Sequence, residues 1–134
     1  MPRVTVDRPE LAAIFAGGFL GAVARAELVE ALPHDAGAWP WATFAANIAG
    51  ALILGYAVTR LQARPPATPY RRSFIATGFC GALTTFSTLQ LELLWMFDRG
   101  DFALAAAYAV ASVTAGVCAV ALTTRLARRE GLAA

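Results

Sequence analysis

The sequence predicts an all-α membrane protein with four transmembrane helices per subunit, the third of them broken mid-membrane. Of its 134 residues, 58% are hydrophobic and only 15% are charged, and the mean hydropathy is positive. This composition is too apolar for an ordinary soluble protein, and the length allows a single domain. Four apolar segments approach the ~20 residues that a spanning helix requires, with short polar connections between them.

The first predicted span begins near Pro9 and ends before Pro33, because proline favours helix boundaries. Residues 11–24 carry no charge, but this stretch is short. The helix must continue past Arg25 and Glu27 to cross the bilayer. The polar N-terminus lacks the features of a signal peptide, so we expect the first apolar segment to be retained.

The second and fourth spans are the most regular. Residues 39–59 and 102–124 contain no charged residue, and Pro40 opens the second helix. Residues 60–69 are rich in proline and arginine and form the connection that follows. We expect one four-helix membrane domain whose spans cover about residues 10–32, 39–61, 72–97 and 102–125.

The third span contains the most informative stretch, residues 78–88, with the sequence GFCGALTTFST. Two glycines and four hydroxyl side chains interrupt an otherwise apolar helix. Backbone freed from a helix is tolerated at membrane depth only where it is buried in protein or lines a cavity. Discontinuous helices of this kind build ion sites from carbonyl groups and helix ends. The alternative is a continuous Ser/Thr-rich helix with a packing glycine, and this segment alone leaves both open.

Arginine placement predicts the orientation. Arg99 lies in a loop on one side of the predicted bundle, beside two aspartates. The other side is flanked by nine arginines: Arg3, Arg8, Arg60, Arg64, Arg71, Arg72, Arg125, Arg128 and Arg129. The positive-inside rule therefore places both termini in the cytoplasm.

Three polar residues lie within the spans. Asn47 is neutral, lies near the middle of the second span and carries two N–H donors. It would either contact an ion or clamp broken backbone between helices. Arg25 and Glu92 lie toward the noncytoplasmic ends of their helices, where they would pair, snorkel or face a vestibule.

A polar path through the membrane would be lined by Asn47, Phe86, Ser87, Thr88, Tyr108 and Ser112. Hydrogen-bond donors dominate this set, and no acidic ring lies at its centre. Such a path suits an anion better than a metal cation, and the positive edge of an aromatic ring would contribute. Spacing alone does not identify the anion.

Small residues recur every four positions in three spans, a pattern that allows close contact between membrane helices. These positions are Gly17 and Gly21, then Ala42, Ala46 and Gly50, then Ala107, Ala111 and Ala115. We interpret them as packing within the chain, with a contact between subunits as the alternative.

Three motifs, in order along the chain, resemble the CrcB/Fluc family of fluoride channels. Residues 17–25 read GGFLGAVAR, residues 43–50 read TFAANIAG, and residues 78–88 read GFCGALTTFST. They are similar to the family patterns GGxxGAxxR, TLxVNxxG and GxxGGxTTFST. The resemblance covers most of the chain.

The resemblance implies a fluoride-selective channel that works by passive electrodiffusion in the bacterial inner membrane. It implies an antiparallel dimer with two narrow pores between oppositely oriented subunits. Asn47 would donate to the ion and Phe86 would present its ring edge. The rest of the polar track would be Ser87, Thr88, Tyr108 and Ser112.

The same resemblance implies a structural sodium ion at the dimer centre, held by backbone carbonyls at Gly81 and Thr84. Arg25 matches the family's vestibular arginine, and Glu92 matches an acidic residue one turn after the third motif. Fluoride, the lipid bilayer and a second subunit are the implied partners. Neither an organic cofactor nor nucleic acid is implied.

The chain departs from the family pattern in three respects. Leu89 stands where a second phenylalanine is common, so one aromatic contact with fluoride would be altered. Ala82 stands where glycine is usual. The arginine bias does not suit a chain that inserts in both orientations equally, and a separately encoded partner of opposite bias is the alternative to a homodimer.

Two other functions compete with a channel. A proton-coupled multidrug or guanidinium exporter would need a carboxylate at mid-membrane in the first span, where Glu27 and Glu30 lie too near the end. A non-transporting membrane scaffold would explain the helices but not the convergent donors. An enzyme is not expected, because no nucleophile–base pair or metal cluster is present in the sequence.

Overall fold

The chain folds into four long helices joined by short connections. The computed structural model describes residues 7–35, 37–63 and 70–132. These residues form α1 (Arg8–Ala31), α2 (Trp41–Ala63), η1 (Ser73–Cys80), α3 (Gly81–Leu83), α4 (Phe86–Asp98) and α5 (Phe102–Leu132), and none of them lies in a strand. Four helical segments in the described part are long and apolar enough to cross a membrane, with residues 73–98 counted as one. The predicted all-α, four-span class is confirmed.

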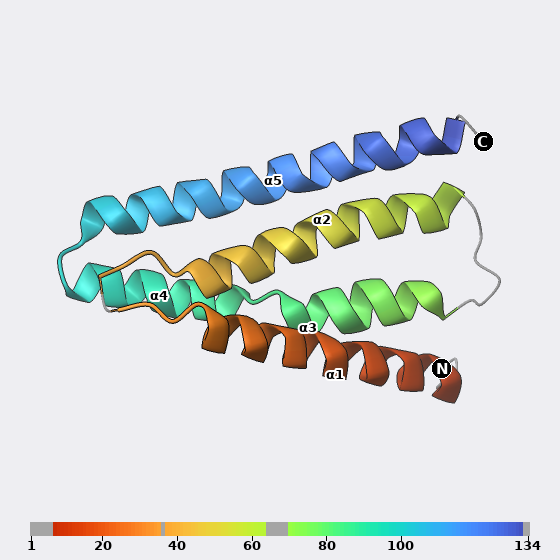
Figure 1. Ribbon diagram of the computed structural model, residues 1–134, viewed down its shortest axis with the longest axis horizontal. Coiled ribbons are helices and arrows are strands. Elements are labelled where there is room, and N and C mark those ends of the chain that lie inside the picture. Colours follow the sequence, from red (N-terminus) through yellow and green to blue (C-terminus); the bar gives the residue numbers. More distant parts are fainter. Residues whose placement is uncertain (1–6, 36, 64–69, 133–134) are drawn as a thin grey trace, which may run out of the picture.

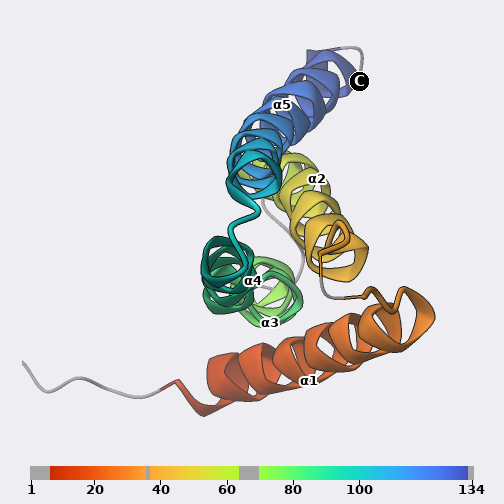
Figure 2. The same ribbon diagram turned by 90° about the vertical axis from the view of Figure 1, so that its left-hand side faces the viewer.

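The helices run alternately up and down, and the two ends of the described chain lie at the same end of the molecule (Figure 1). α5 packs along α2, and α1 packs along η1. Viewed from the end, α1 lies crosswise beneath α3 and α4, while α5 leans away at the far side (Figure 2). The arrangement is therefore open rather than a closed bundle.

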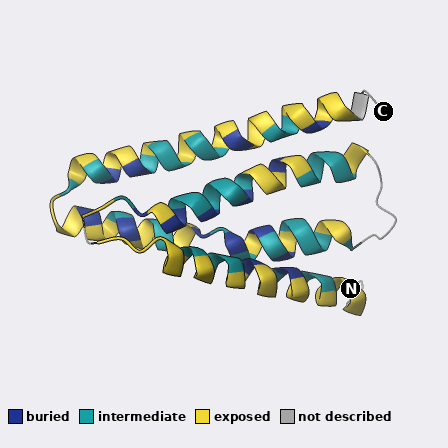
Figure 3. Ribbon diagram, in the orientation of Figure 1, coloured by how far each residue is buried: buried dark blue, intermediate teal, exposed yellow. Residues whose placement is uncertain are grey.

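Few side chains are buried within this single subunit, and the outer faces of α1 and α5 are largely exposed (Figure 3). The apolar core is formed by Met96, Ala105 and Tyr108, with Leu89 among the side chains packed against it. An exposed apolar surface is the expected state for helices in lipid, because hydrocarbon is as apolar as their side chains.

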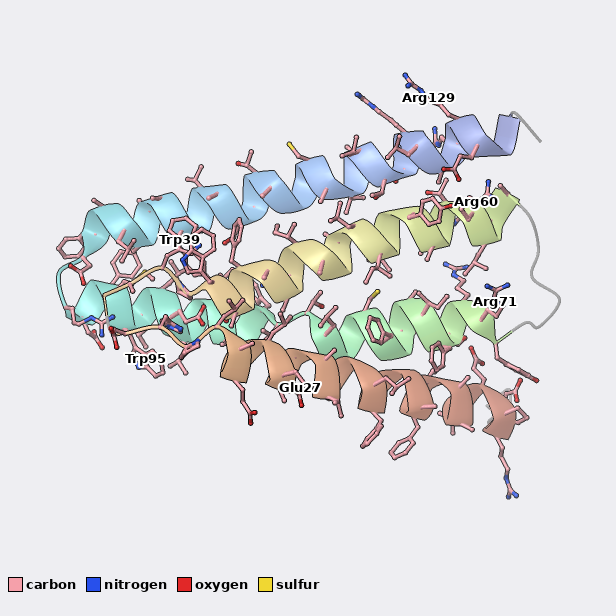
Figure 4. The ribbon with its side chains drawn as sticks, in the orientation of Figure 1. Glu27, Trp39, Arg60, Arg71, Trp95 and Arg129 are labelled. Atoms are coloured by element: carbon pink, nitrogen blue, oxygen red, sulfur yellow. The ribbon has the colours of Figure 1, made fainter. Side chains whose placement is uncertain are left out.

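Apart from Arg25 and Arg99, the described arginines belong to one end of the molecule. Arg60, Arg71 and Arg129 lie at the end that carries the termini, and Trp39 and Trp95 lie at the opposite end (Figure 4). This grouping agrees with the sequence prediction. Two members of the predicted cluster, Arg3 and Arg64, lie outside the described residues.

Two helices run further at this end than their apolar stretches. α2 continues through Arg60 to Ala63, and α5 continues to Leu132. The added residues are mostly arginine, leucine and alanine, which favour helix. Arginine near a helix C-terminus is also stabilised by the helix dipole. The rest of the predicted connection, residues 64–69, lies outside the described residues.

Two of the three small-residue stripes are buried within the chain. Gly17 and Gly21 are buried on α1, and so is the stripe on α2. The third stripe differs, since Ala107 is exposed and Ala111 and Ala115 are only half-buried. The prediction of packing within the chain therefore holds for α1 and α2.

Candidate ion-conducting site

The third span is interrupted at two residues. α3 ends at Leu83, Thr84 (φ −79°, ψ 152°) and Thr85 (φ −146°, ψ 120°) are extended, and α4 begins at Phe86. Gly81 itself is helical (φ −62°, ψ −33°). The interruption therefore does not use the conformational freedom of glycine, and its cause must be sought in tertiary contacts.

Asn47 provides the main contact. Its amide Nδ2 donates to the Thr85 carbonyl (3.1 Å), and its Oδ1 accepts from the Thr85 N–H (2.7 Å). The side chain thus replaces a helical neighbour for both backbone groups of Thr85, which would be costly to leave unpaired in a membrane. One of the two possibilities raised by the sequence, a clamp on broken backbone, is present, and the second N–H of the amide remains for another acceptor.

The interruption leaves several carbonyls without their helical donors, among them those of Gly81 and Thr84. In a continuous α-helix, the N–H of residue i+4 donates to the carbonyl of residue i. The Thr85 N–H donates instead to Asn47, and the Thr88 N–H donates to the Thr85 hydroxyl (3.2 Å). The carbonyls of Gly81 and Thr84 therefore lack the i+4 bond and can accept from, or coordinate, another group.

Hydroxyl groups gather directly after the break. Thr85 is the N-cap of α4, and its hydroxyl also donates to the Thr88 hydroxyl (2.9 Å). The Ser87 hydroxyl lies 3.4 Å from that of Thr85. Because the Thr88 hydroxyl accepts here, its own proton is available to a ligand.

Phe86 and Ser87 are directed away from the subunit. The Phe86 side chain is 71% exposed, and Ser87 is also exposed. A large exposed aromatic ring beside a polar backbone segment is not explained by packing within one chain. In one subunit this face of the break is open, so that lipid, a ligand or a second subunit can cover it.

The structure places Glu92 in a buried hydrogen-bonded cluster. Its side chain is 5% exposed, and its carboxylate accepts from the Thr43 hydroxyl (2.5 Å) and the Tyr108 hydroxyl (2.7 Å). The two donors come from α2 and α5, so one carboxylate joins three helices. Sequence reasoning did not assign this role to Thr43. The signal was present, because Thr43 lies one turn before Asn47 on the same face of α2.

Of the remaining predicted residues, Arg25 lies apart from these two clusters, whereas Ser112 lies one turn after Tyr108 on α5. Arg25 is half-buried on α1, and the ion pairs among described residues join Arg60 with Glu130 and Arg99 with Asp101. The Ser112 hydroxyl on α5 is buried and has no hydrogen-bond partner within the described part of the chain. Ser112 also lines an open groove together with Ala51, so this part of α5 lies at a surface that a second subunit could cover.

A pocket of about 240 Å³ leads toward the buried carboxylate from the arginine-poor end. It is lined by Glu92, Trp95 and Met96 together with loop residues that include His34 and Arg99. No group of three or more His, Cys, Asp or Glu side chains that could hold a metal ion occurs among the described residues. Any ion at the break would therefore meet amide, hydroxyl and carbonyl groups.

These features define the class of the molecule: an integral membrane protein whose interrupted third helix presents polar groups suited to an ion, as in channels and transporters. A family model described as CrcB-like protein, Camphor Resistance (CrcB), matches residues 12–124. The chain belongs to the CrcB family, and the resemblance seen in its motifs is confirmed.

The relatives agree with this assignment. The chain is 53% identical to the fluoride-specific ion channel FluC 1 of Mycobacterium tuberculosis (strain CDC 1551 / Oshkosh), over 92% of this chain and 93% of that protein. It is 42% identical to FluC 1 of Streptomyces avermitilis, over 78% and 84%. It is 37% identical to FluC of Bordetella avium (strain 197N), over 75% and 79%. With its four apolar helices, the chain is a multi-pass bacterial membrane protein of an ion-channel family rather than an enzyme.

Proposed function

We propose that this chain forms a fluoride-selective channel that lowers cytoplasmic fluoride by passive electrodiffusion. The observation that carries the proposal is the polar interruption of the third span, where an amide, three hydroxyls and an exposed aromatic ring lie together. The relatives named fluoride-specific ion channels supply the identity of the ion.

The chemistry of the site supports an anion. Asn47 has an N–H left after its bond to Thr85, and the hydroxyls of Ser87 and Thr88 offer protons at the same level. A small hard anion requires such donors, and the positive edge of the Phe86 ring would add to them. The nearby carboxylate of Glu92 already accepts two hydroxyl donors, which lowers its repulsion of an anion.

A second subunit of opposite orientation completes the proposed pore. Phe86 and Ser87 are exposed on one side of the break, and Ser112 on α5 has a buried hydroxyl without a described partner. One subunit thus provides separate groups of pore-lining residues rather than an enclosed path. An antiparallel partner would bring the Phe86 of one chain opposite the hydroxyls of the other, with Ser112 along the track and Tyr108 buried behind it, where its hydroxyl donates to Glu92.

The break also suits the proposed structural sodium ion. The carbonyls of Gly81 and Thr84 lack their i+4 donors, because Thr85 and Thr88 donate elsewhere. Carbonyl oxygens are suitable ligands for a hard cation. Two such oxygens from each subunit of an antiparallel pair would supply a four-oxygen site that ties the subunits together.

The partner need not be a copy of this chain. Arg60, Arg71 and Arg129 lie at the end that carries the termini, whereas the loop at the other end holds Arg99, and this bias is an orientation signal under the positive-inside rule. Streptomyces avermitilis has two relatives of this chain, named FluC 1 and FluC 3, so family members can occur together in one organism. We therefore include a separately encoded, oppositely oriented homologue as a possible second subunit.

The first test is fluoride efflux from liposomes that contain only this purified chain, followed with a fluoride electrode and with chloride as the control anion. Rapid efflux that excludes chloride is expected if the chain suffices as a homodimer. Efflux that appears only after co-reconstitution with an oppositely biased homologue would establish a heterodimer. Absence of fluoride flux under both conditions, from folded protein, would overturn the proposed function.

Two substitutions test the pore residues. Asn47→Asp should abolish efflux, because it places a negative charge in the anion path and removes the donor.

Phe86→Ile should slow efflux by roughly tenfold, the upper value for loss of one aromatic contact. Phe15→Ile is the matched control, because Phe15 is 76% exposed on α1 and lies outside the proposed pore. Equal efflux from Phe86→Ile and Phe15→Ile would remove Phe86 from the pore.

The structure weakens the exporter alternative. Glu27 is exposed and directed away from the bundle in the view of Figure 4, and Glu30 is exposed as well. Neither carboxylate lies in a protected mid-membrane site that proton exchange would require. A scaffold would not need the paired Asn47–Thr85 bonds or the buried carboxylate of Glu92.

A further inference from the structure

Two neighbouring hollows lie on the face formed by α1, α2 and η1, and the proposed pore uses neither of them. One hollow lies further from the arginine-rich end and so deeper in the membrane. This deeper hollow, of about 560 Å³, is lined by apolar side chains that include Leu20, Leu52 and Phe79. Its lining includes one side chain with a polar atom, Tyr56, whose hydroxyl donates to Glu130 on α5 (2.8 Å). The deeper hollow is therefore suited to hydrocarbon.

The outer hollow, of about 390 Å³, continues the deeper one toward the arginine-rich end. The two share Phe74 and Ile75, and the outer one adds Ala13, Tyr70 and Arg71. Arg71 precedes Ser73, the first residue of the third span, so it lies at the level of lipid headgroups. Together the hollows form a groove that is apolar inside the membrane and cationic at its surface.

This groove is separate from the polar face. Leu52, Ile53 and Tyr56 line it from α2, whereas Ala51 lines a different groove together with Ser112. With 3.6 residues per turn, Ala51 lies on the opposite side of α2 from the middle of this set. A second subunit that covers Ser112 would therefore leave the groove facing the bilayer.

We propose that this groove binds one anionic phospholipid of the surrounding bilayer. An acyl chain lies in the deeper hollow, and the phosphate of the headgroup lies against Arg71. The arginine guanidinium matches phosphate geometry through paired N–H donors. Arg60, one turn beyond Tyr56 on α2, lies at the same end (Figure 4), but it is paired with Glu130 (3.9 Å), so Arg71 is the cation left for the phosphate.

Because two carboxylates lie near the outer hollow, binding of an anionic headgroup there depends on the positive charge of Arg71. Glu10 accepts a hydrogen bond from Ser73 (2.6 Å), and the negative charge of Asp7 raises the pKa of Tyr70. Both carboxylates belong to the start of α1, beside the outer hollow. Without Arg71, a phosphate would face these two carboxylates, and an anionic headgroup would lose its advantage over a zwitterionic one.

The test uses the full-length chain in phosphatidylcholine vesicles that contain a small fraction of phosphatidylglycerol with a photoreactive acyl chain. Peptide mapping after illumination should place the crosslinks on residues 52–57 and 74–79. Arg71→Gln should lower this crosslinking about fivefold, which corresponds to the ~1 kcal/mol contributed by an arginine near an anionic surface. Photoreactive phosphatidylcholine with the same acyl chain should lose clearly less crosslinking, because its choline group offsets the phosphate charge that Arg71 neutralises.

Arg72→Gln is the matched control, because Arg72 is the adjacent exposed arginine and lines neither hollow. Equal losses for Arg71→Gln and Arg72→Gln would overturn the proposal in favour of general surface charge. Ala57→Phe, which fills the deeper hollow, should reduce crosslinking of both lipids. Displacement of the photoreactive lipid by inorganic phosphate, with Ala57→Phe unaffected, would indicate a soluble anion site instead. The test does not depend on fluoride conduction, so it can fail or succeed separately from the proposed function.

Discussion

The two halves of the third span are held in the membrane by opposite means. The first half, η1 and α3, contacts α1 through backbone, with Gly17 and Gly21 against carbonyls of η1. The second half, α4, is joined to α2 and α5 by side chains, through the carboxylate of Glu92. Each half is thus fixed independently of the other.

This difference explains how the interruption keeps a defined geometry. A π-helix over Ser73–Cys80 has a wider cross-section than an α-helix and offers its backbone to close neighbours. Gly78 matches this from the other side, because a Cβ at that position would lie 2.5 Å from the Ile14 carbonyl. Thr84 and Thr85 then span two anchored halves, and Asn47 fixes the join. The interruption therefore has a defined backbone geometry and is not a flexible connection.

The largest expected effect comes from blocking the close backbone contact between α1 and the first half of the third span. A Cβ at Gly17 would overlap the Phe74 carbonyl oxygen and come within 2.9 Å of the Phe79 N–H nitrogen. Since both are backbone atoms, Gly17→Ala should cost roughly 3 kcal/mol or prevent folding. The measurement is the fraction of detergent-solubilised protein that remains monodisperse after heating.

Gly18→Ala is the control for that experiment. The atom nearest to a Cβ at Gly18 is the Gly78 carbonyl oxygen at 3.9 Å, which is ordinary contact. Alanine favours helix over glycine by ~0.5–1 kcal/mol, so Gly18→Ala should be neutral or stabilising. If the two adjacent glycines respond alike, the backbone contact does not anchor the first half.

The next effect tests the side-chain anchor of the second half. Glu92→Ala would leave the buried hydroxyls of Thr43 and Tyr108 without an acceptor and should cost about 2–4 kcal/mol. Glu92→Gln keeps one carbonyl oxygen, and a hydroxyl can turn to accept from the new amide, so its cost should be about 1 kcal/mol. Thermal inactivation of the two variants in detergent measures the difference, and equal losses would show that hydrogen bonding does not hold this half.

Hydropathy and arginine placement were sufficient to predict the coarse fold. Long uncharged stretches predicted α2 and α5, because membrane spans are the one structure in which apolarity along the whole length determines the outcome. The polar stretch at residues 78–88 also located the interruption approximately. These are local properties, which one sequence displays directly.

The detailed site was not predictable, because it depends on contacts between distant residues. The break was expected around Gly81 and Thr84, but Gly81 is helical and the extended residues are Thr84 and Thr85, since Asn47 bonds to Thr85 from 38 residues away. Likewise, the four-residue spacing with Gly21 predicted that Gly17 packs closely, but not that it meets the backbone of Phe74 and Phe79. A π-helix has no sequence signature comparable to a hydrophobic period, so η1 was also not anticipated.

A smaller effect is expected from enlarging a side chain in the second half. Leu89 packs against the cluster of Met96, Ala105 and Tyr108 instead of standing free at the break. Leu89→Phe should therefore overpack this cluster and cost about 1–2 kcal/mol. Fluoride efflux should change less than in Phe86→Ile, and the two variants should be compared in one liposome preparation. A strong gain or loss of flux with unchanged thermal stability would instead place Leu89 in the ion path.

The smallest expected effect concerns the first residue of the second half, where the two anchors meet. The Thr85 hydroxyl caps α4 by accepting from the Thr88 N–H, so Thr85→Ala should cost about 1 kcal/mol. Thr85→Ser retains the hydroxyl and should keep most of that stability. Both variants keep the backbone groups that bind Asn47, so the interruption itself should persist. If Thr85→Ala proved as damaging as Gly17→Ala, the cap rather than the backbone contact of the first half would hold the interruption in place.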